Sequence, residues 1–277
     1  MEYRIIADSC CDLTPELKEK LSITTVPLTM RLGAKEFKDD DTLDLPAFMA
    51  EMEACTDKVG SASPPPSAYQ EAFKPGATNF AVTISSKLSG SYDSAMMGKQ
   101  LAEENGNADV HVFDCKSASA AETLLTIKIH ELIKNNLSKD AIVDSINHFI
   151  KSMKTYFVLE RYDNLQKNGR LNKITGKIIS VLGVRLVMGA DQNGDIALYH
   201  KARGEGSMLE KMVMLVENSG KKTDGEKMVI SHCNNPGLAQ RLADAVKERF
   251  HFANIYLVPT GGLSSLYADS KGVVMAF

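Results

Sequence analysis

Short apolar runs alternate with segments of helical periodicity through the first half of the chain. Runs with the length and composition of strands lie at residues 3–8, 24–32, 80–84 and 110–114. Segments with apolar residues at helical spacing, or with helix-start residues, lie at 45–53, 91–104, 121–133 and 139–151, and Thr14–Pro15–Glu16 begins an earlier helix. Strands that alternate with helices favour a parallel sheet covered by helices on both faces.

The second half of the chain has a different pattern. Apolar runs at 184–188 and 196–200 flank Asp191–Gln192–Asn193–Gly194, which predicts a β-hairpin. Further strands are expected at 227–231, 253–258 and 273–277, and helices at 206–218 and 235–250, with Gly261–Gly262 interrupting a strand. A hairpin among α/β elements indicates a mixed sheet. We therefore predict two α/β domains, residues 1–152 and 153–277, although no linker marks the boundary.

Small polar residues follow three of the predicted strands, where ligands of parallel sheets usually bind. They are Asp8–Ser9, Ser85–Ser86 and Asp114–Cys115. A serine- and proline-rich loop is predicted at 61–67, and residues 85–91 connect a strand to a helix. Hydroxyl groups and free N–H groups at that helix N-terminus could hold an anion, with Gly90 allowing close approach. The competing interpretation is that Ser89 only caps the helix and Ser61 only belongs to a turn.

Composition narrows the function classes. The chain has 277 residues and a net charge of −3 from 32 Lys and Arg against 35 Asp and Glu, which argues against nucleic-acid binding through a basic surface. No apolar run is long enough for a membrane span, and the first residues do not resemble a signal peptide, so we expect a cytoplasmic protein. Five cysteines without CxxC spacing indicate free thiols. Thirteen methionines suit an adaptable core or an apolar ligand cavity.

Several catalytic and metal motifs are incomplete. Leu209 occupies the third glycine position of a GxGxxG pattern that begins at Gly204, and Lys134 replaces the second histidine of an HExxH pattern that begins at His130. No GxxxxGK[ST] or GxSxG sequence occurs. Asp8 with Asp12, and the run Asp39–Asp41, could bind a hard cation, but a solvated loop is the favoured interpretation. We therefore predict no catalytic residue and no metal site.

Six segments carry a resemblance to a known family. The most specific is residues 84–95, ISSKLSGSYDSA, which is similar to the ISSxLSGTYxSA segment of the DegV family. The other segments also occur in family order along the chain: DSCCDL at 8–13, SASP at 61–64, LQKNGRL at 165–171, VRLV at 184–187, where the family usually has KPIL, and KAR at 201–203. This sequence departs from the family pattern at Ala62, Pro65, Asn168 and Tyr267, the last where the family commonly has histidine.

The resemblance implies a three-layer α/β/α parallel-sheet domain followed by a two-layer α/β mixed-sheet domain. It also implies one long-chain fatty acid in a tunnel between the domains, without a cofactor, and a separate fatty acid kinase as partner. Carried over by motif, Ser61, Ser89, Gly90 and Ser91 bind the carboxylate, with Tyr267 beside them. Arg170 and Arg203 match basic positions where the kinase docks.

Our leading hypothesis is a non-catalytic fatty-acid carrier that neither binds nucleic acid nor inserts stably into membranes. One alternative is a hydrolase or phosphotransferase acting on a small anion, with Ser61 or Ser89 as nucleophile. His111 and Tyr267 are the candidate bases for that enzyme. A second alternative is a lipid-responsive regulator that contacts another protein through Arg170 and Arg203.

Overall fold

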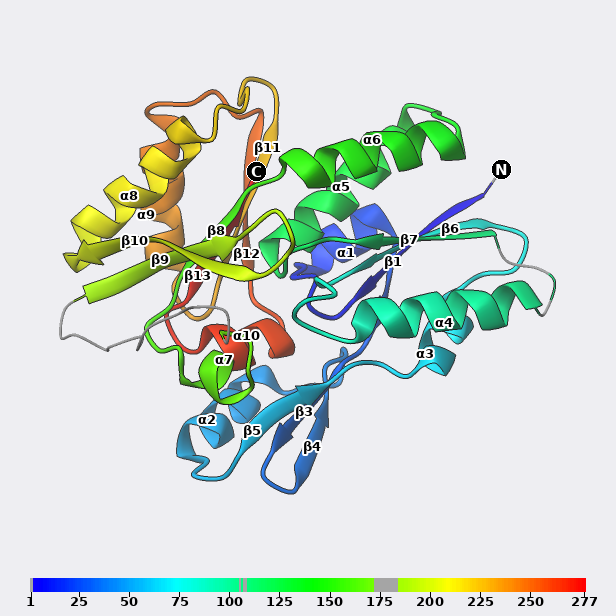
Figure 1. Ribbon diagram of the computed structural model, residues 1–277, viewed down its shortest axis with the longest axis horizontal. Coiled ribbons are helices and arrows are strands. Elements are labelled where there is room, and N and C mark those ends of the chain that lie inside the picture. The colour runs from blue at the N-terminus through cyan, green and yellow to red at the C-terminus, as the bar shows by residue number, and fades with distance from the viewer. Residues whose placement is uncertain (1, 105, 107–108, 172–183) are drawn as a thin grey trace.

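A four-stranded parallel sheet organises the first part of the molecule. The computed structural model describes residues 2–104, 106, 109–171 and 184–277 (Figure 1). The strands of this sheet are, in spatial order, β2 (Ile23–Val26), β1 (Tyr3–Asp8), β6 (Thr78–Thr83) and β7 (Asp109–Asp114). The central strand β6 is buried at all of its positions, as expected for a parallel sheet with both faces covered.

Helices cover both faces of the parallel sheet (Figure 1). On one face lie α3 (Pro66–Ala72) and α4 (Ser91–Glu104). On the other face lie α1 (Pro15–Leu21), α5 (Ala120–Lys134) and α6 (Lys139–Ser152). The predicted start of α1 is confirmed, because the Thr14 side chain accepts a hydrogen bond from the Leu17 N–H and Pro15 stands at the first helical position.

A small antiparallel sheet extends from the first part of the chain. It contains, in order, β4 (Lys35–Lys38), β3 (Thr29–Leu32) and β5 (Val59–Ala62), and α2 (Leu45–Ala54) lies beside it. Gly33, with a φ of 61°, makes the turn between β3 and β4. The prediction of a continuous loop at 61–67 is wrong at both ends, because Ser61 pairs with Met30 in β5 and Pro66 begins α3.

A six-stranded mixed sheet organises the second part of the molecule. Its strands are, in order, β10 (Ile196–Arg203), β9 (Val184–Ala190), β8 (Thr155–Val158), β13 (Val273–Ala276), β11 (Lys227–His232) and β12 (Asn254–Pro259). The predicted hairpin joins β9 to β10, and only β11 and β12 are parallel. Helices α8 (Gly204–Asn218) and α9 (Pro236–Lys247) pack on one face of this sheet.

Helix α5 lies between the two large sheets. It packs against β1 and β6 on one side and against β11 and β13 on the other. One hydrophobic cluster therefore runs through both parts of the molecule, from Ile5 and Phe80 to Val229 and Val274. A second cluster fills the space between the mixed sheet and the helix pair α8 and α9.

The predicted fold class, a parallel-sheet α/β/α unit followed by a mixed-sheet unit, is confirmed. The division at residue 152 stays a prediction; it coincides with the end of α6, before β8 begins the mixed sheet. Two short elements near the C-terminal part of the mixed sheet, α7 (Asp163–Lys167) and α10 (Gly262–Ala268), complete the described structure. The sequence analysis predicted only an interrupted strand at Gly261–Gly262 and did not predict helix α10.

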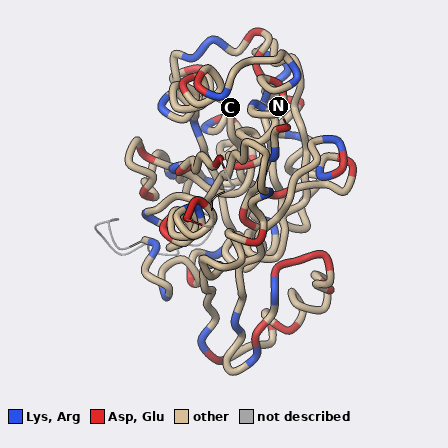
Figure 2. Tube along the Cα trace, turned by 90° about the vertical axis from the view of Figure 1, so that its right-hand side faces the viewer, with Lys and Arg blue, Asp and Glu red and all other residues tan. Residues whose placement is uncertain are grey.

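The distribution of charged residues and the hydropathy of the helices agree with the expectations drawn from the composition. Lys and Arg alternate with Asp and Glu along the trace rather than forming one continuous basic stripe (Figure 2). Among the described residues, no helix combines the length and apolar character needed to cross a membrane.

Candidate ligand-binding site

An apolar cavity lies where the loops that follow the parallel strands meet the mixed sheet. The loops after β1, β6 and β7 form one side, and β8, β9, β13, α7 and α10 contribute to the other. Its apolar lining comes mainly from Leu28, Ile84, Leu88, Phe157, Leu159, Leu165, Ile196, Leu263 and Val274. This position agrees with the expectation that ligands bind beyond the carboxyl ends of parallel strands.

A group of polar side chains interrupts the apolar lining. The Ser61 and Tyr267 hydroxyl oxygens lie 2.8 Å apart, although the two residues are 206 positions apart in the sequence. Ser89 and Arg170 line the same cavity. Four of the residues predicted to take part in binding or docking are therefore brought together around one cavity.

Arg170 is held firmly in this polar group. Its Nε donates a hydrogen bond to the Leu88 carbonyl oxygen at 3.1 Å, and its Nη1 donates to the Asn168 carbonyl oxygen at 2.7 Å. The guanidinium carbon lies 5.6 Å from the centre of the Tyr267 ring, within the range of a cation–π contact. Arg170 is the sole cationic side chain among the described residues of the lining. Sequence reasoning placed Arg170 on a docking rim, whereas the structure places it in the cavity wall.

Three other predicted residues lie outside the lining. Ser91 is fully buried, and its hydroxyl donates a hydrogen bond to Asp8 Oδ2 at 2.6 Å and lies 2.6 Å from the Tyr69 hydroxyl. The expected contact of the Ser91 hydroxyl with a ligand is thus not supported, since Asp8 and Tyr69 occupy it. Gly90 is exposed beside Ser63, and Arg203 is exposed at the end of β10.

The N-terminus of α10 is anchored by two buried carboxylates. Asp39 accepts hydrogen bonds from the N–H groups of Gly262 and Leu263, both at 2.9 Å, and Asp12 accepts one from the Gly261 N–H at 2.8 Å. Burial raises the pKa of Asp39 to about 6, although these bonds oppose the shift. Carboxylates at a helix N-terminus stabilise the helix. They also fix Tyr267, because α10 carries it.

The interpretation of the acidic residues as a solvated loop is wrong for Asp8, Asp12 and Asp39. All three are buried, and only Asp40 and Asp41 of the acidic run remain accessible. Local sequence could not distinguish these cases, because the partners that bury the carboxylates come from distant parts of the chain.

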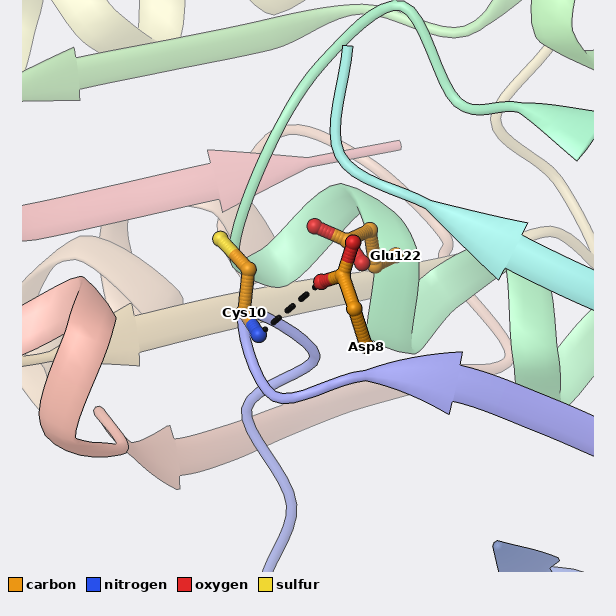
Figure 3. A group of neighbouring side chains, drawn as sticks. All are labelled: Asp8, Cys10 and Glu122. Atoms are coloured by element: carbon orange, nitrogen blue, oxygen red, sulfur yellow. Dashed lines mark hydrogen bonds between the residues drawn. The ribbon is translucent and has the colours of Figure 1, made fainter. Parts of the chain in front are cut away.

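Asp8 and Glu122 form a buried carboxyl pair beneath the cavity. The two carboxyl groups and the Cys10 thiol each place one atom within 4.8 Å of the others (Figure 3). Asp8 accepts hydrogen bonds from the N–H groups of Cys10 and Ile84 and from the Ser91 hydroxyl. Neither carboxyl oxygen of Glu122 has a hydrogen-bond partner among the described residues. Burial, and next the nearby charge of Asp8, raise the pKa of Glu122 well above its usual value.

A neutral Glu122 explains this arrangement without a metal ion. The protonated carboxyl of Glu122 can donate to Asp8, whose other hydrogen bonds stabilise its ionised form. Two adjacent carboxylates in a dry interior would otherwise repel each other strongly. Because backbone N–H groups already occupy Asp8, the geometry favours a neutral Glu122 over a cation at this cluster.

We expect Glu122→Gln to change the free energy of unfolding by less than about 1 kcal/mol, because glutamine keeps the shape and one donor of a neutral glutamic acid. Asp8→Asn is expected to cost about 2–4 kcal/mol, because the amide group cannot accept all the bonds that the carboxylate accepts. Urea denaturation of both variants at neutral pH measures these differences. Equal destabilisation by the two substitutions, or a rise in melting temperature on adding Mn²⁺ or Zn²⁺ to the wild type, would contradict the neutral state of Glu122.

Of the two candidate catalytic bases, Tyr267 lies beside the candidate nucleophile Ser61, whereas His111 lies outside the cavity lining. His111 lies on β7 against Phe113, with ring centres 4.5 Å apart, and it does not line the cavity. No histidine occurs among the described lining residues. The Ser89 hydroxyl accepts a hydrogen bond from the Ser91 N–H at 3.2 Å, so it caps α4 as the competing interpretation proposed.

Sequence reasoning missed several residues of the cavity. Ser117 and Thr155 line it from the β7–α5 connection and from β8, and neither stands in a motif. None of the described lining residues is methionine, so the interpretation of the methionines as cavity lining is wrong. Met30, Met188, Met208, Met212, Met228 and Met275 are instead completely buried in the core.

Comparison with known proteins places this architecture in a family. The DegV family model, described as an uncharacterised protein family, matches residues 2–276. A DegV domain-containing protein of Streptococcus gordonii is 39% identical over 282 residues, covering 100% of this chain and 99% of the relative.

Two solved structures are similar over nearly their whole length. A DegV family protein of Ruminococcus gnavus, refined with vaccenic acid, has a TM-score of 0.95 and 34% identity, with 99% of each chain covered. The Fatty Acid Kinase (Fak) B3 protein of Streptococcus pneumoniae, loaded with linoleic acid, has a TM-score of 0.90 and 35% identity, with 100% of this chain and 99% of that chain covered. From the match of the family model and the identity to these relatives, we conclude that the chain belongs to the DegV family.

Proposed function

We propose that this protein binds one long-chain fatty acid in the apolar cavity and carries out no chemistry on it. The observation that carries the proposal is the composition of the cavity wall, in which Ser61, Ser89, Arg170 and Tyr267 belong to a lining that is mainly apolar. Such a wall matches a ligand with one anionic group and a long hydrocarbon chain. The fatty acids bound in the R. gnavus and S. pneumoniae relatives support the same ligand class.

The carboxylate of the fatty acid is expected to lie beside the polar side chains of the cavity wall. The Ser61, Ser89 and Tyr267 hydroxyls supply hydrogen bonds, and Arg170 supplies the opposite charge. Gly90 follows Ser89 but lies outside the described lining, so its contact with the carboxylate stays a prediction. Burial of a long acyl chain contributes on the order of 10 kcal/mol before the costs of binding, at about 0.8 kcal/mol per CH₂ group.

The polar residues of the cavity support a carrier over an enzyme, because the described lining offers no histidine base to Ser61 or Ser89. The Ser61 hydroxyl contacts Tyr267, the Ser89 hydroxyl caps α4, and the described lining contains no histidine. We further propose that a separate kinase phosphorylates the bound carboxylate in the cytoplasm, with no cofactor bound to this chain. The relation to the Fak B3 protein supports the kinase, and five unpaired cysteines suit a reducing compartment. Arg203, exposed at the end of β10, is the predicted docking residue.

We expect protein purified from a bacterial host to contain one fatty acid per chain. Denaturing mass spectrometry of the extracted lipid, followed by reloading of delipidated protein with palmitate or oleate, measures the ligand and its stoichiometry. Protein that holds no lipid and takes up neither acid would contradict the proposal. Hydrolysis of acyl esters that Ser89→Ala abolishes would favour the enzyme alternative instead.

A further inference from the structure

A second cavity adjoins the apolar one. Its volume is about 190 Å³, and it is formed by the β7–α5 connection, the end of α6 and the β9–β10 turn. Ser117, Thr155 and Ala190 line both cavities. Because the same side chains are reached from both sides, the wall between the cavities is a single layer of residues.

Two buried hydroxyls form the polar part of this wall. Ser117 and Thr155 are only 3% and 5% exposed, and the Ser117 hydroxyl donates a hydrogen bond to Thr155 Oγ1 at 2.8 Å. The Thr155 hydroxyl proton has no acceptor among the described residues. A buried hydroxyl that lacks a partner for its proton is costly, and this one borders a cavity whose lining is mainly apolar.

The other lining hydroxyls on this side are already committed. Ser119 donates to Asp12, and Ser264 donates to the Cys10 carbonyl oxygen at 3.4 Å. Thr155 therefore differs from its neighbours in having a donor to offer to the contents of the cavity.

The second cavity supplies a polar environment behind the wall. Its charged lining residues are Lys116, Lys151, Lys154 and Asp191. The Asp191 carboxylate accepts the N–H groups of Asn193 and Asp195 within the turn, at 2.8 and 3.0 Å. The three lysines form no ion pair with any described residue. An oxygen atom at the wall thus faces hydroxyls on one side and a polar space on the other.

We propose that Ser117 and Thr155 form a second recognition point for the acyl chain, selective for a long-chain fatty acid with a neutral oxygen substituent, a hydroxyl or keto group, on its tail. This inference rests on the proposed fatty-acid binding and specifies the ligand class further. An unsubstituted methylene chain leaves the Thr155 donor unsatisfied, whereas an oxygen at the matching carbon accepts its hydrogen bond. Only substituents at one region of the tail reach the wall, so the preference depends on position.

The test compares hydroxystearic acids substituted at successive carbons with stearic acid, by displacement of a fluorescent fatty acid from delipidated protein. For each protein, the affinity of every regioisomer is divided by that for stearic acid. We expect hydroxyl groups at one or two neighbouring carbons of the chain to raise this ratio in the wild type. At those carbons the wild-type ratio should be about five- to tenfold higher than the ratio in Thr155→Val, which corresponds to the free energy of one neutral hydrogen bond. Valine has nearly the same shape, so stearic acid binding is kept or tightened.

Ser264→Ala is the matched control, because it removes a lining hydroxyl whose donor is already used. We expect its ratios to follow the wild type. The second recognition point would be overturned if the affinity ratios of the wild type and Thr155→Val were equal for every regioisomer. It would also be overturned if Thr155→Val changed the ratios of all regioisomers by the same factor. A wild type that does not bind stearic acid would instead overturn the proposed function.

Discussion

Replacing Arg170 with methionine is expected to weaken the binding of palmitate by about 10- to 100-fold, equivalent to about 1.4–3 kcal/mol. Arg170 is the sole cation in the described lining of an apolar cavity, so no other described lining residue can balance the charge of the carboxylate there. Its bonds to the Leu88 and Asn168 carbonyls use only part of its donors and fix the direction of the rest. Displacement titrations on delipidated protein measure the loss.

A neutral ligand separates the charge of Arg170 from its packing. Hexadecanol has the same chain but no carboxylate, so Arg170→Met should weaken its binding by less than about threefold. Arg31→Met is the control for removal of an arginine, because Arg31 pairs with Glu36 on the exposed side of β3, away from the cavity. If palmitate and hexadecanol lose affinity equally in Arg170→Met, then Arg170 only supports the cavity wall through Tyr267.

The fold was predictable where short-range patterns and topology agree. The alternation of strands and helices gave the parallel sheet, and Asp191–Gly194 gave the β9–β10 hairpin, because both patterns depend on neighbours in the sequence. The pattern joined β2 and β3, which belong to different sheets, into one strand at 24–32, and it missed β5 and α10. Both are short, and they are held by partners far along the chain, β3 for one and the Asp12 and Asp39 carboxylates for the other.

The candidate site was predictable only as far as motifs reach. Family motifs identified Ser61, Ser89, Arg170 and Tyr267, which all line the cavity. They could not show that the Ser91 hydroxyl bonds Asp8 instead, since a motif gives the residue type and not the direction of the side chain. Glu122 stands in a helical segment with no distinguishing neighbour, and its burial against Asp8 depends on the packing of α5 on β1.

The position of α10 connects the stability of the protein to its ligand site. Asp12 follows β1 and Asp39 follows β4, so elements at the start of the chain hold a helix that is formed almost at its end. That helix contributes Leu263, Ser264, Tyr267 and Ala268 to the cavity. A change that breaks the anchoring should therefore reduce both the free energy of unfolding and fatty acid affinity.

Gly262→Ala is expected to break this anchoring and to lower the free energy of unfolding by about 3–5 kcal/mol, combining overpacking with loss of charge-assisted hydrogen bonds. A β-carbon at residue 262 would collide with the Asp39 carboxylate and would lie 2.6 Å from Leu43 Cδ2 and 2.7 Å from Met30 Cε. Since Gly→Ala within a helix normally stabilises by roughly 1 kcal/mol, the expected sign is opposite to that of helix propensity. Urea denaturation monitored by circular dichroism measures the change, and palmitate titration of the folded variant measures the effect on the site.

The neighbouring glycine provides the matched control. A β-carbon at Gly261 would meet only the Ser9 carbonyl oxygen at 3.5 Å and Asp12 Oδ1 at 3.8 Å, which are ordinary contacts, and its φ of −72° suits alanine. We therefore expect Gly261→Ala to cost less than about 1 kcal/mol, as for a residue that caps a helix through its backbone alone. Equal stabilities of the two variants would mean that α10 can move away from Asp39 without loss, and that the two carboxylates do not fix the position of Tyr267.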